Sequence, residues 1–132
     1  MEDKAKTDKG ITLRLLKERF AVCRIRKTEQ ADLTVPFTFL SVTEEEVSLV
    51  CPEDSAPVET LAREDGWRCL KIEGILDFSM IGVIAGISQT LAQAGISLFA
   101  ISTYNTDYVL IREAMLEKAI NALSGDGYAL IL

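Results

Sequence analysis

The stretch Met80-Ile-Gly-Val-Ile-Ala-Gly-Ile-Ser-Gln-Thr-Leu-Ala-Gln-Ala94 decides the fold of this chain, because it carries the clearest helical pattern in the sequence. Its apolar residues recur every three or four positions and therefore share one face of an α-helix. These residues are Met80, Val83, Ile84, Ile87, Leu91 and Ala94. We expect Ser79 to cap the start of this helix and Gly95 to end it in a left-handed conformation.

Short apolar runs on both sides of this helix predict strands. A turn at Asn105-Thr106-Asp107 separates two of them, and a second helix follows. The predicted strands are Trp67–Ile72, Ile96–Tyr104, Tyr108–Arg112 and Tyr128–Leu132, and the second helix is Glu113–Leu123. The order strand, helix, strand, strand, helix, strand indicates a ferredoxin-like α+β fold, an antiparallel sheet with helices on one face.

The first half of the chain repeats this pattern in a degenerate form. At a shift of 60 residues three identical pairs fall into register: Phe39 with Phe99, Thr43 with Thr103, and Glu53 with Glu113. The first strands, Phe20–Ile25 and Trp67–Ile72, match at a shift of 47. The missing 13 residues amount to about 3.6 helical turns. Lys27–Pro36 stands in their place without a helical face, so we expect the first half to lack or shorten its first helix.

The remaining elements of the first half follow from the same patterns. They are strands at Ile11–Leu16, Phe20–Ile25, Phe37–Val42 and Val47–Cys51 and a short helix at Pro57–Arg63. We therefore expect a polar leader at residues 1–10, a degenerate half at 11–65 and a complete half at 66–132.

Composition narrows the class of function. The net charge of −6 disfavours nucleic acid and anionic membranes as partners. The polar N-terminus lacks the apolar core of a signal peptide, which favours a cytoplasmic protein. Three scattered cysteines, Cys23, Cys51 and Cys69, are expected to be buried thiols, and there is no histidine. With no nucleophile–base pair, phosphate loop or metal cluster, we expect neither an enzyme nor a cofactor.

Three segments of the second half resemble the ACT domain. They are Leu76–Val83, Leu91–Ser97 and Ile101–Glu113. More narrowly, they resemble the subfamily of the cytosolic arginine sensors of eukaryotes, the CASTOR proteins, and their small bacterial relatives. The resemblance implies two tandem ACT-like halves and a regulatory module that binds an amino acid.

Two departures from the family pattern matter. Many ACT domains have Asp-x-Pro-Gly at the start of the first helix, whereas this chain has Ser79-Met80-Ile81-Gly82 and lacks the proline. The first half has Val47 where the second has Asp107. If that carboxylate holds a ligand, the first half cannot hold one in the same way, and we expect one site per chain.

The candidate ligand-binding residues surround the start of the main helix and the following turn: Asp77, Ser79, Met80, Gly82, Val83, Tyr104 and Asp107. A helix N-terminus attracts carboxylates, and Gly82 permits close approach, although helix–sheet packing would explain that glycine equally well. Asp77 is a ligand contact or a loop cap. From the sequence alone Asp107 is explained as a turn residue, since aspartate is common in turns, but the resemblance implies that it contacts the ligand.

The functional hypothesis is a binding module with an amino acid at the junction of the two halves. Its carboxylate would lie at the helix N-terminus near Ser79 and its ammonium near Asp107. The alternative is a structural dimerisation or adaptor module that binds no ligand. An unrecognised enzyme is a third alternative. A homodimer or an unknown protein partner is compatible with either of the first two hypotheses.

Overall fold

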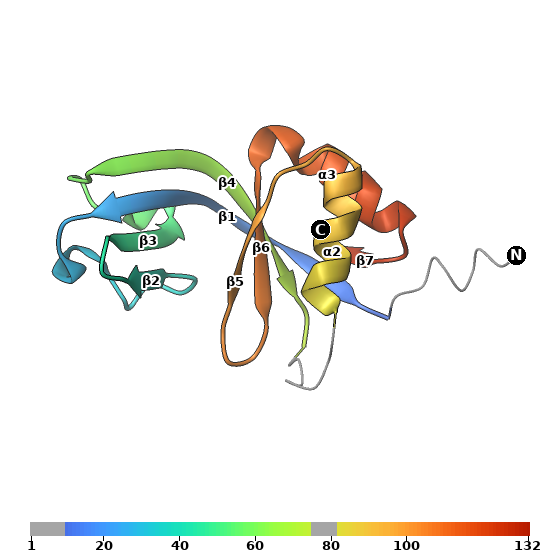
Figure 1. Cartoon of the computed structure of the whole chain (residues 1–132), viewed down its shortest axis with the longest axis horizontal. Helices are drawn as coiled ribbons and strands as arrows, with labels where there is room; N and C mark the ends of the chain where they lie inside the picture. Colours follow the sequence, from blue (N-terminus) through green and yellow to red (C-terminus); the bar gives the residue numbers. More distant parts are fainter. Residues whose placement is uncertain (1–9, 75–81) are drawn as a thin grey trace, which may run out of the picture. The chain divides into compact units, whose positions relative to one another are not determined.

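The computed structural model describes residues 10–74 and 82–132 (Figure 1). It confirms the predicted α+β class with its antiparallel sheet. The strands are β1 (Thr12–Ile25), β2 (Phe39–Val42), β3 (Val47–Pro52), β4 (Ala62–Ile72), β5 (Phe99–Ser102), β6 (Asp107–Arg112) and β7 (Ala129–Ile131). The helices are α2 (Val83–Gln93) and α3 (Leu116–Gly125), with short 3-10 turns η1 (Thr28–Gln30), η2 (Glu53–Ser55) and η3 (Glu113–Met115).

The chain forms two compact units. The N-terminal unit is Lys17–Trp67, and the C-terminal unit combines the residues up to Leu16 with Arg68–Leu132. Strands β1 and β4 therefore contribute residues to both units. The sequence predicted halves at 11–65 and 66–132, whereas the compact C-terminal unit also includes the start of β1.

The C-terminal unit packs two helices against strands. Strands β4, β6 and β5 are neighbours, and the start of β1 pairs in parallel with β7. Alternating residues of the strands face apolar residues of both helices, as the period of a strand requires. The buried core consists of Leu13, Leu70, Ile72, Ile87, Leu91, Ile96, Val109, Ile111, Ala119, Leu123 and Tyr128. This arrangement is the complete βαββαβ pattern predicted for the second half.

The N-terminal unit contains the same strands without the helices. Strands β2, β3 and β1 are antiparallel neighbours, and β4 follows β1. One buried cluster of this unit consists of Ala21, Cys23, Ile25, Leu49 and Cys51. All of residues 17–67 are described, and they contain only the turns η1 and η2 where the repeat has helices. The expected loss of the first helix is confirmed.

The 60-residue repeat is confirmed element by element. Strands β2 and β5 coincide at this shift, as do β3 and β6 and the turns η2 and η3. Both hairpins also share a register, with Val42 opposite Val47 and Ser102 opposite Asp107. The sequence signal of three identities therefore marks a real structural repeat.

The helix predicted at Pro57–Arg63 is wrong. Strand β4 already begins at Ala62, and the Leu61 amide donates a 2.8 Å hydrogen bond to the Arg24 carbonyl. Pairing with β1 satisfies backbone groups that a helix would otherwise satisfy internally. The first half thus lacks both helices, not one.

Two strands are longer than their apolar runs. The predicted strands Ile11–Leu16 and Phe20–Ile25 are one continuous strand, β1, and β4 starts five residues before Trp67. In both extensions charged residues alternate with or precede buried ones, and the charged residues lie on the exposed side. An exposed stretch of strand is polar and therefore gives no apolar signal.

The main helix ends as predicted but begins later. Gly95 is left-handed, and the Gly95 and Ile96 amides donate to the carbonyls of Ala92 and Leu91, the two bonds of a Schellman motif. At the other end, α2 starts at Val83 with Gly82 as its N-cap. The predicted cap Ser79 lies outside the described residues. None of the helices in the described ranges is long and apolar enough to cross a bilayer.

Candidate functional site

The hairpin between β5 and β6 positions the strongest sequence candidate, Asp107. The turn runs from Thr103 to Thr106, where the Thr103 amide donates to the Thr106 carbonyl at 2.9 Å. The Thr103 hydroxyl donates to the same carbonyl at 3.1 Å, and the Thr106 amide donates to that hydroxyl at 3.4 Å. Asp107 is therefore the first residue of β6, opposite Ser102. The sequence had placed Asp107 in the turn itself.

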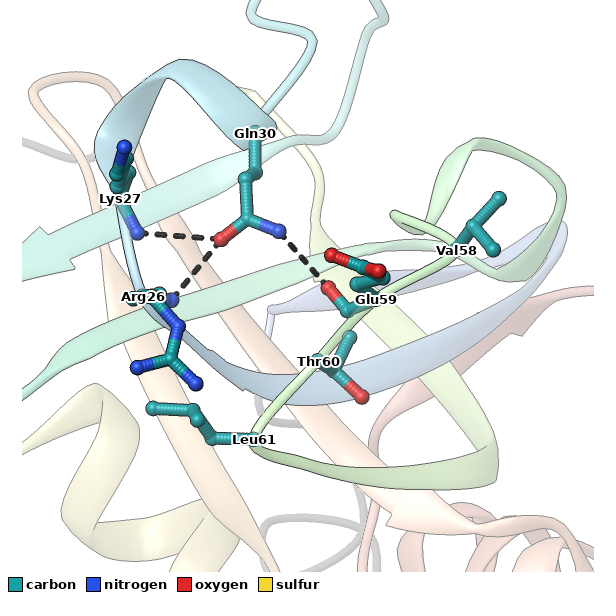
Figure 2. A pocket seen from close by; sticks show the side chains of 7 residues that line it. All are labelled: Arg26, Lys27, Gln30, Val58, Glu59, Thr60 and Leu61. Carbon is teal, nitrogen blue, oxygen red and sulfur yellow. Dashed lines mark hydrogen bonds between the residues drawn. The ribbon is translucent and has the colours of Figure 1, made fainter.

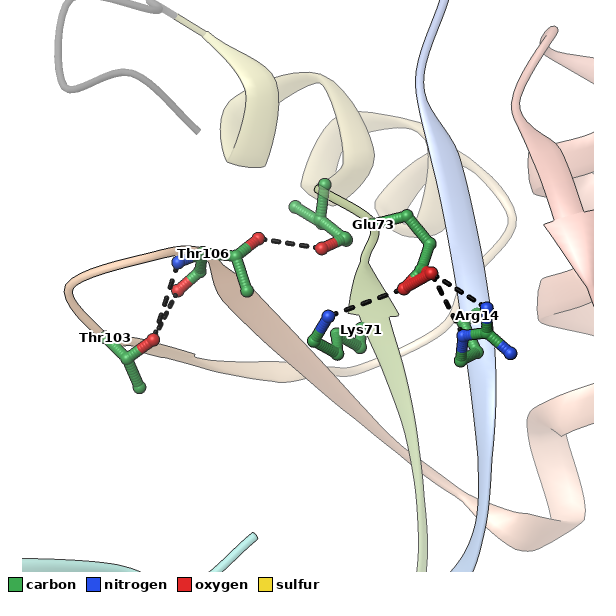
Figure 3. Close-up of polar contacts among 6 residues, drawn as sticks. Arg14, Lys71, Glu73, Thr103 and Thr106 are labelled. Carbon is green, nitrogen blue, oxygen red and sulfur yellow. Dashed lines mark hydrogen bonds and ion pairs between the residues drawn. The ribbon is translucent and has the colours of Figure 1, made fainter. Parts of the chain in front are cut away.

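A buried threonine, which the sequence did not single out, anchors this turn to the end of β4. The Thr106 hydroxyl donates a 2.8 Å hydrogen bond to the Ile72 carbonyl, and Thr106 is only 3% exposed (Figure 3). Because a buried hydroxyl must be partnered, this bond fixes the turn against the strand end. Asp107 is consequently held beside the point at which β4 ends.

The Asp107 side chain lies at the start of β6. The residue is half-buried, and in the described part of the chain its side chain makes no hydrogen bond or ion pair. The other candidate of this hairpin, Tyr104, is 82% exposed at the tip of the turn, so it is not ordinary core packing. The neighbouring Tyr108 is half-buried, and burial raises its pKa.

A second carboxylate near the end of β4 is occupied. Glu73 Oε1 accepts hydrogen bonds from Arg14 Nε at 3.0 Å and Arg14 Nη2 at 2.9 Å. Its other oxygen lies 3.4 Å from Lys71 Nζ (Figure 3). The hydrogen bonds from Arg14 hold the pKa of Glu73 below its usual value. Glu73 is thus neutralised by its neighbours, whereas Asp107 has no such cationic partner among the described residues.

The start of α2 offers backbone donors. Gly82 is the N-cap in the left-handed conformation, with φ of +82°, and supplies no side chain to cap the first turn. The backbone amides of the first turn of α2 have no carbonyl partner within the helix, so they can donate hydrogen bonds to a carboxylate. Gly82 was expected inside the first turn of the helix, but it precedes that turn. Its positive φ explains why a glycine occupies this position. Val83 packs against the core.

The remaining candidates, Asp77, Ser79 and Met80, lie outside the described residues. Of the others, Gly82 and Val83 are adjacent at the helix start, and Tyr104 and Asp107 lie at the hairpin. All four belong to the C-terminal unit.

Metal and nucleophile chemistry find no support in the described ranges. No group of three metal-ligating side chains occurs there. Cys23, Cys51 and Cys69 form no disulfide within the described residues and are at most 2% exposed, as expected for buried thiols. Burial raises the pKa of Cys23 and of Cys51, so their reactive thiolates are disfavoured.

A pocket of about 630 Å³ lies in the N-terminal unit, and none of the sequence candidates lines it. It is lined by the residues that follow β1, the turn η1 and the segment before β4. Most of its residues are polar, and no pattern in the sequence pointed to them.

Comparison with known proteins finds a family model and several solved structures that are similar to this chain. The model of the ACT-domain family matches residues 62–125. A protein from Agrobacterium tumefaciens is similar at 29% identity, with a TM-score of 0.82 over 92% of each chain. A Vibrio cholerae protein of unknown function, named a possible transport protein, is 19% identical with a TM-score of 0.67, over 86% of this chain and 87% of that one.

A structure of stated function is also similar. The regulatory subunit of Thermus thermophilus aspartate kinase, in its ligand-free form, is 16% identical, with a TM-score of 0.63 over 86% of this chain and 95% of that one. At this identity the likeness concerns the fold alone. The family match, by contrast, starts where β4 starts and stops where α3 stops. The ACT-domain family model therefore matches the part of this chain that runs from β4 through α3.

Proposed function

We propose that this chain is a regulatory module that binds an amino acid in its C-terminal unit. The ligand's ammonium pairs with Asp107, and its carboxylate meets the amides at the start of α2. The observation that carries the proposal is the state of Asp107, a half-buried carboxylate without a partner in the described residues, held in place by the Thr106–Ile72 hydrogen bond.

Two further observations support this proposal. ACT domains are in general amino-acid-binding regulatory modules, and the family match covers α2, β5 and β6. The resemblance of Ile101–Glu113 to the arginine sensors supports an amino acid as the ligand and the cytoplasm as the location. The module then carries no catalytic step of its own, and binding shifts a conformational or oligomeric equilibrium that a partner reads.

The structural alternative is a dimerisation or adaptor module that binds no ligand. It rests on the sheet order, which leaves β2 and β5 at the two ends. Edge strands present unpaired backbone groups to another chain. The two functions differ in one respect that is simple to measure, which is whether an amino acid stabilises the protein.

A thermal-shift screen of the full chain against the twenty amino acids at millimolar concentration separates them. A ligand at a hundred times its dissociation constant adds about 2.7 kcal/mol to stability. A melting temperature raised by several degrees with one amino acid or one class supports the proposal. If none of the twenty moves the curve, the structural alternative is favoured.

Calorimetry on variants then tests the site itself. Asp107→Asn keeps the shape but removes the charge, and a hydrogen bond to a charged group is worth about 1.5–3 kcal/mol. Binding should weaken about ten- to a hundredfold. Asp54→Asn, an exposed carboxylate of the N-terminal unit, is the matched control and should bind normally. Val47→Asp should create no second site. Full-strength binding by Asp107→Asn would remove Asp107 from the site.

A further inference from the structure

The pocket in the N-terminal unit occupies the place from which helices are missing. Its lining includes Arg26 and Lys27 directly after β1, Gln30 in η1, and the segment before β4. A ferredoxin-like half has helices over its sheet, but this unit has only 3-10 turns there. The volume of about 630 Å³ lies within the range of small-molecule sites, about 300–1,000 Å³.

Gln30 gives the pocket a defined frame. Its side-chain oxygen accepts hydrogen bonds from the Arg26 amide at 2.9 Å and the Lys27 amide at 3.1 Å. Its side-chain nitrogen donates to the Glu59 carbonyl at 2.9 Å (Figure 2). One carboxamide thus joins the two segments of the wall, and the Leu61 amide adds a 2.8 Å bond to the Arg24 carbonyl. The wall is held by the protein's own bonds before any ligand arrives.

The wall of this pocket carries charged side chains of both signs. Arg26, Lys27 and Glu59 line the pocket, and within the described residues none of their charged groups makes an ion pair or a hydrogen bond. The lining carries one net positive charge, although the whole chain has a net charge of −6. Two apolar side chains lie beside them: Val58 is fully exposed and Leu61 is half-exposed.

We propose that this pocket is a second ligand site, which takes an acidic amino acid. Such a ligand carries two carboxylates and one ammonium, the complement of two cations and one carboxylate, and its net charge of −1 balances the lining. Complementary charge of this kind gives specificity as well as attraction. The ligand's methylene groups cover the Val58 and Leu61 side chains. This site lies in the N-terminal unit, whereas the site of the proposed function lies in the C-terminal unit. The two sites also differ in their residues and in the charge of the ligand.

The test is a residue-resolved NMR titration of the isotope-labelled full chain with L-glutamate. Saturable shifts should appear at the amides of residues 26–30 and 58–61. Arg26→Gln should weaken this binding about ten- to a hundredfold, the amount expected for a hydrogen bond to a charged group. Lys118→Gln, an exposed cation on α3, is the matched control and should bind like the wild type. Since both substituted side chains are exposed, the spectra of the free variants should retain the native dispersion.

A second arm tests the ammonium contact. Glutarate has both carboxylates but no ammonium, so the wild type should bind it more weakly than glutamate. Glu59→Gln should abolish that preference, whereas Glu117→Gln should keep it. The proposal is overturned if residues 26–30 and 58–61 do not shift, if sodium chloride of equal ionic strength shifts them equally, or if Arg26→Gln binds normally. Shifts confined to Gly82–Val83 and Thr103–Asp107 would support the proposed function and overturn this site. Shifts confined to residues 26–30 and 58–61 would support this site, and the proposed function would then require a different amino acid.

Discussion

The N-terminal and C-terminal units contain the same hairpin and differ in what covers it. Strands β2 and β3 match β5 and β6 in length and register, and each pair is followed by a 3-10 turn. In the C-terminal unit α3 follows that turn, while in the N-terminal unit the chain returns directly to the sheet. The hairpin therefore depends on its own turn and pairing, whereas the helices determine the size of the core.

The largest expected effect comes from the helix-covered core. Leu91→Ala empties a position on α2 that is fully buried, and such truncations cost about 2–5 kcal/mol. Leu49→Ala is the counterpart in the N-terminal core and should cost less, because that cluster is smaller and its turns can relax into the cavity. Urea unfolding of both variants measures the difference. A larger loss for Leu49→Ala would contradict the assignment of the main core to the C-terminal unit.

A close contact on α2 provides the next test. A Cβ at Gly86 would lie 2.9 Å from the Tyr128 hydroxyl, and Tyr128 is buried. Gly86→Ala should therefore destabilise the protein by about 1–3 kcal/mol, as overpacking does. Gly125→Ala, at the end of α3 with open space around it, should stabilise by about 0.4–1 kcal/mol. Equal effects of the two substitutions in thermal unfolding would show that Tyr128 does not restrict this helix.

The two hairpin turns differ at one equivalent position. Thr106 is buried and bonded to the Ile72 carbonyl, whereas its counterpart at the 60-residue shift, Glu46, is exposed. Thr106→Val leaves that buried carbonyl without its partner and should cost about 1–3 kcal/mol. Glu46→Val should change stability by less than about 0.5 kcal/mol. If chemical denaturation finds the two variants equally stable, Thr106 is not the anchor of the turn.

The smallest expected effect is a pH dependence that arises from Glu73 in the C-terminal unit. The pKa of Glu73 is lowered in the folded state by Arg14, so its contribution to stability is present above the unfolded pKa, about 4.3. That contribution is lost as the pH falls below this value through the folded pKa. Unfolding of the wild type and of Glu73→Gln between pH 6 and pH 3 should show a shallower loss for the variant. Parallel curves would exclude Glu73 from the acid response.

The sequence predicted those features that have a local cause. The period of the apolar residues located α2, and Gly95 marked its end. The three identities at a shift of 60 residues related the β2–β3 hairpin to the β5–β6 hairpin. The buried thiols followed from their apolar surroundings. Local patterns sufficed in these cases because the residues that give the signal are those that make the contact.

The sequence did not predict features that depend on tertiary pairing. The segment Pro57–Arg63 has the residues of a helix start, yet the bond between Leu61 and Arg24 draws it to the sheet. The role of Thr106 depends on a carbonyl 34 residues away, which no spacing rule connects. The pocket framed by Gln30 likewise joins segments 29 residues apart.

The most direct test of the proposed function is an NMR titration of the labelled full chain with the amino acid that stabilises it most in the thermal screen. The proposed function predicts saturable shifts at Gly82–Val83 and Thr103–Asp107, and an affinity about ten- to a hundredfold lower in Asp107→Asn. Saturable binding that leaves these residues unmoved, or that Asp107→Asn retains at full strength, would contradict it.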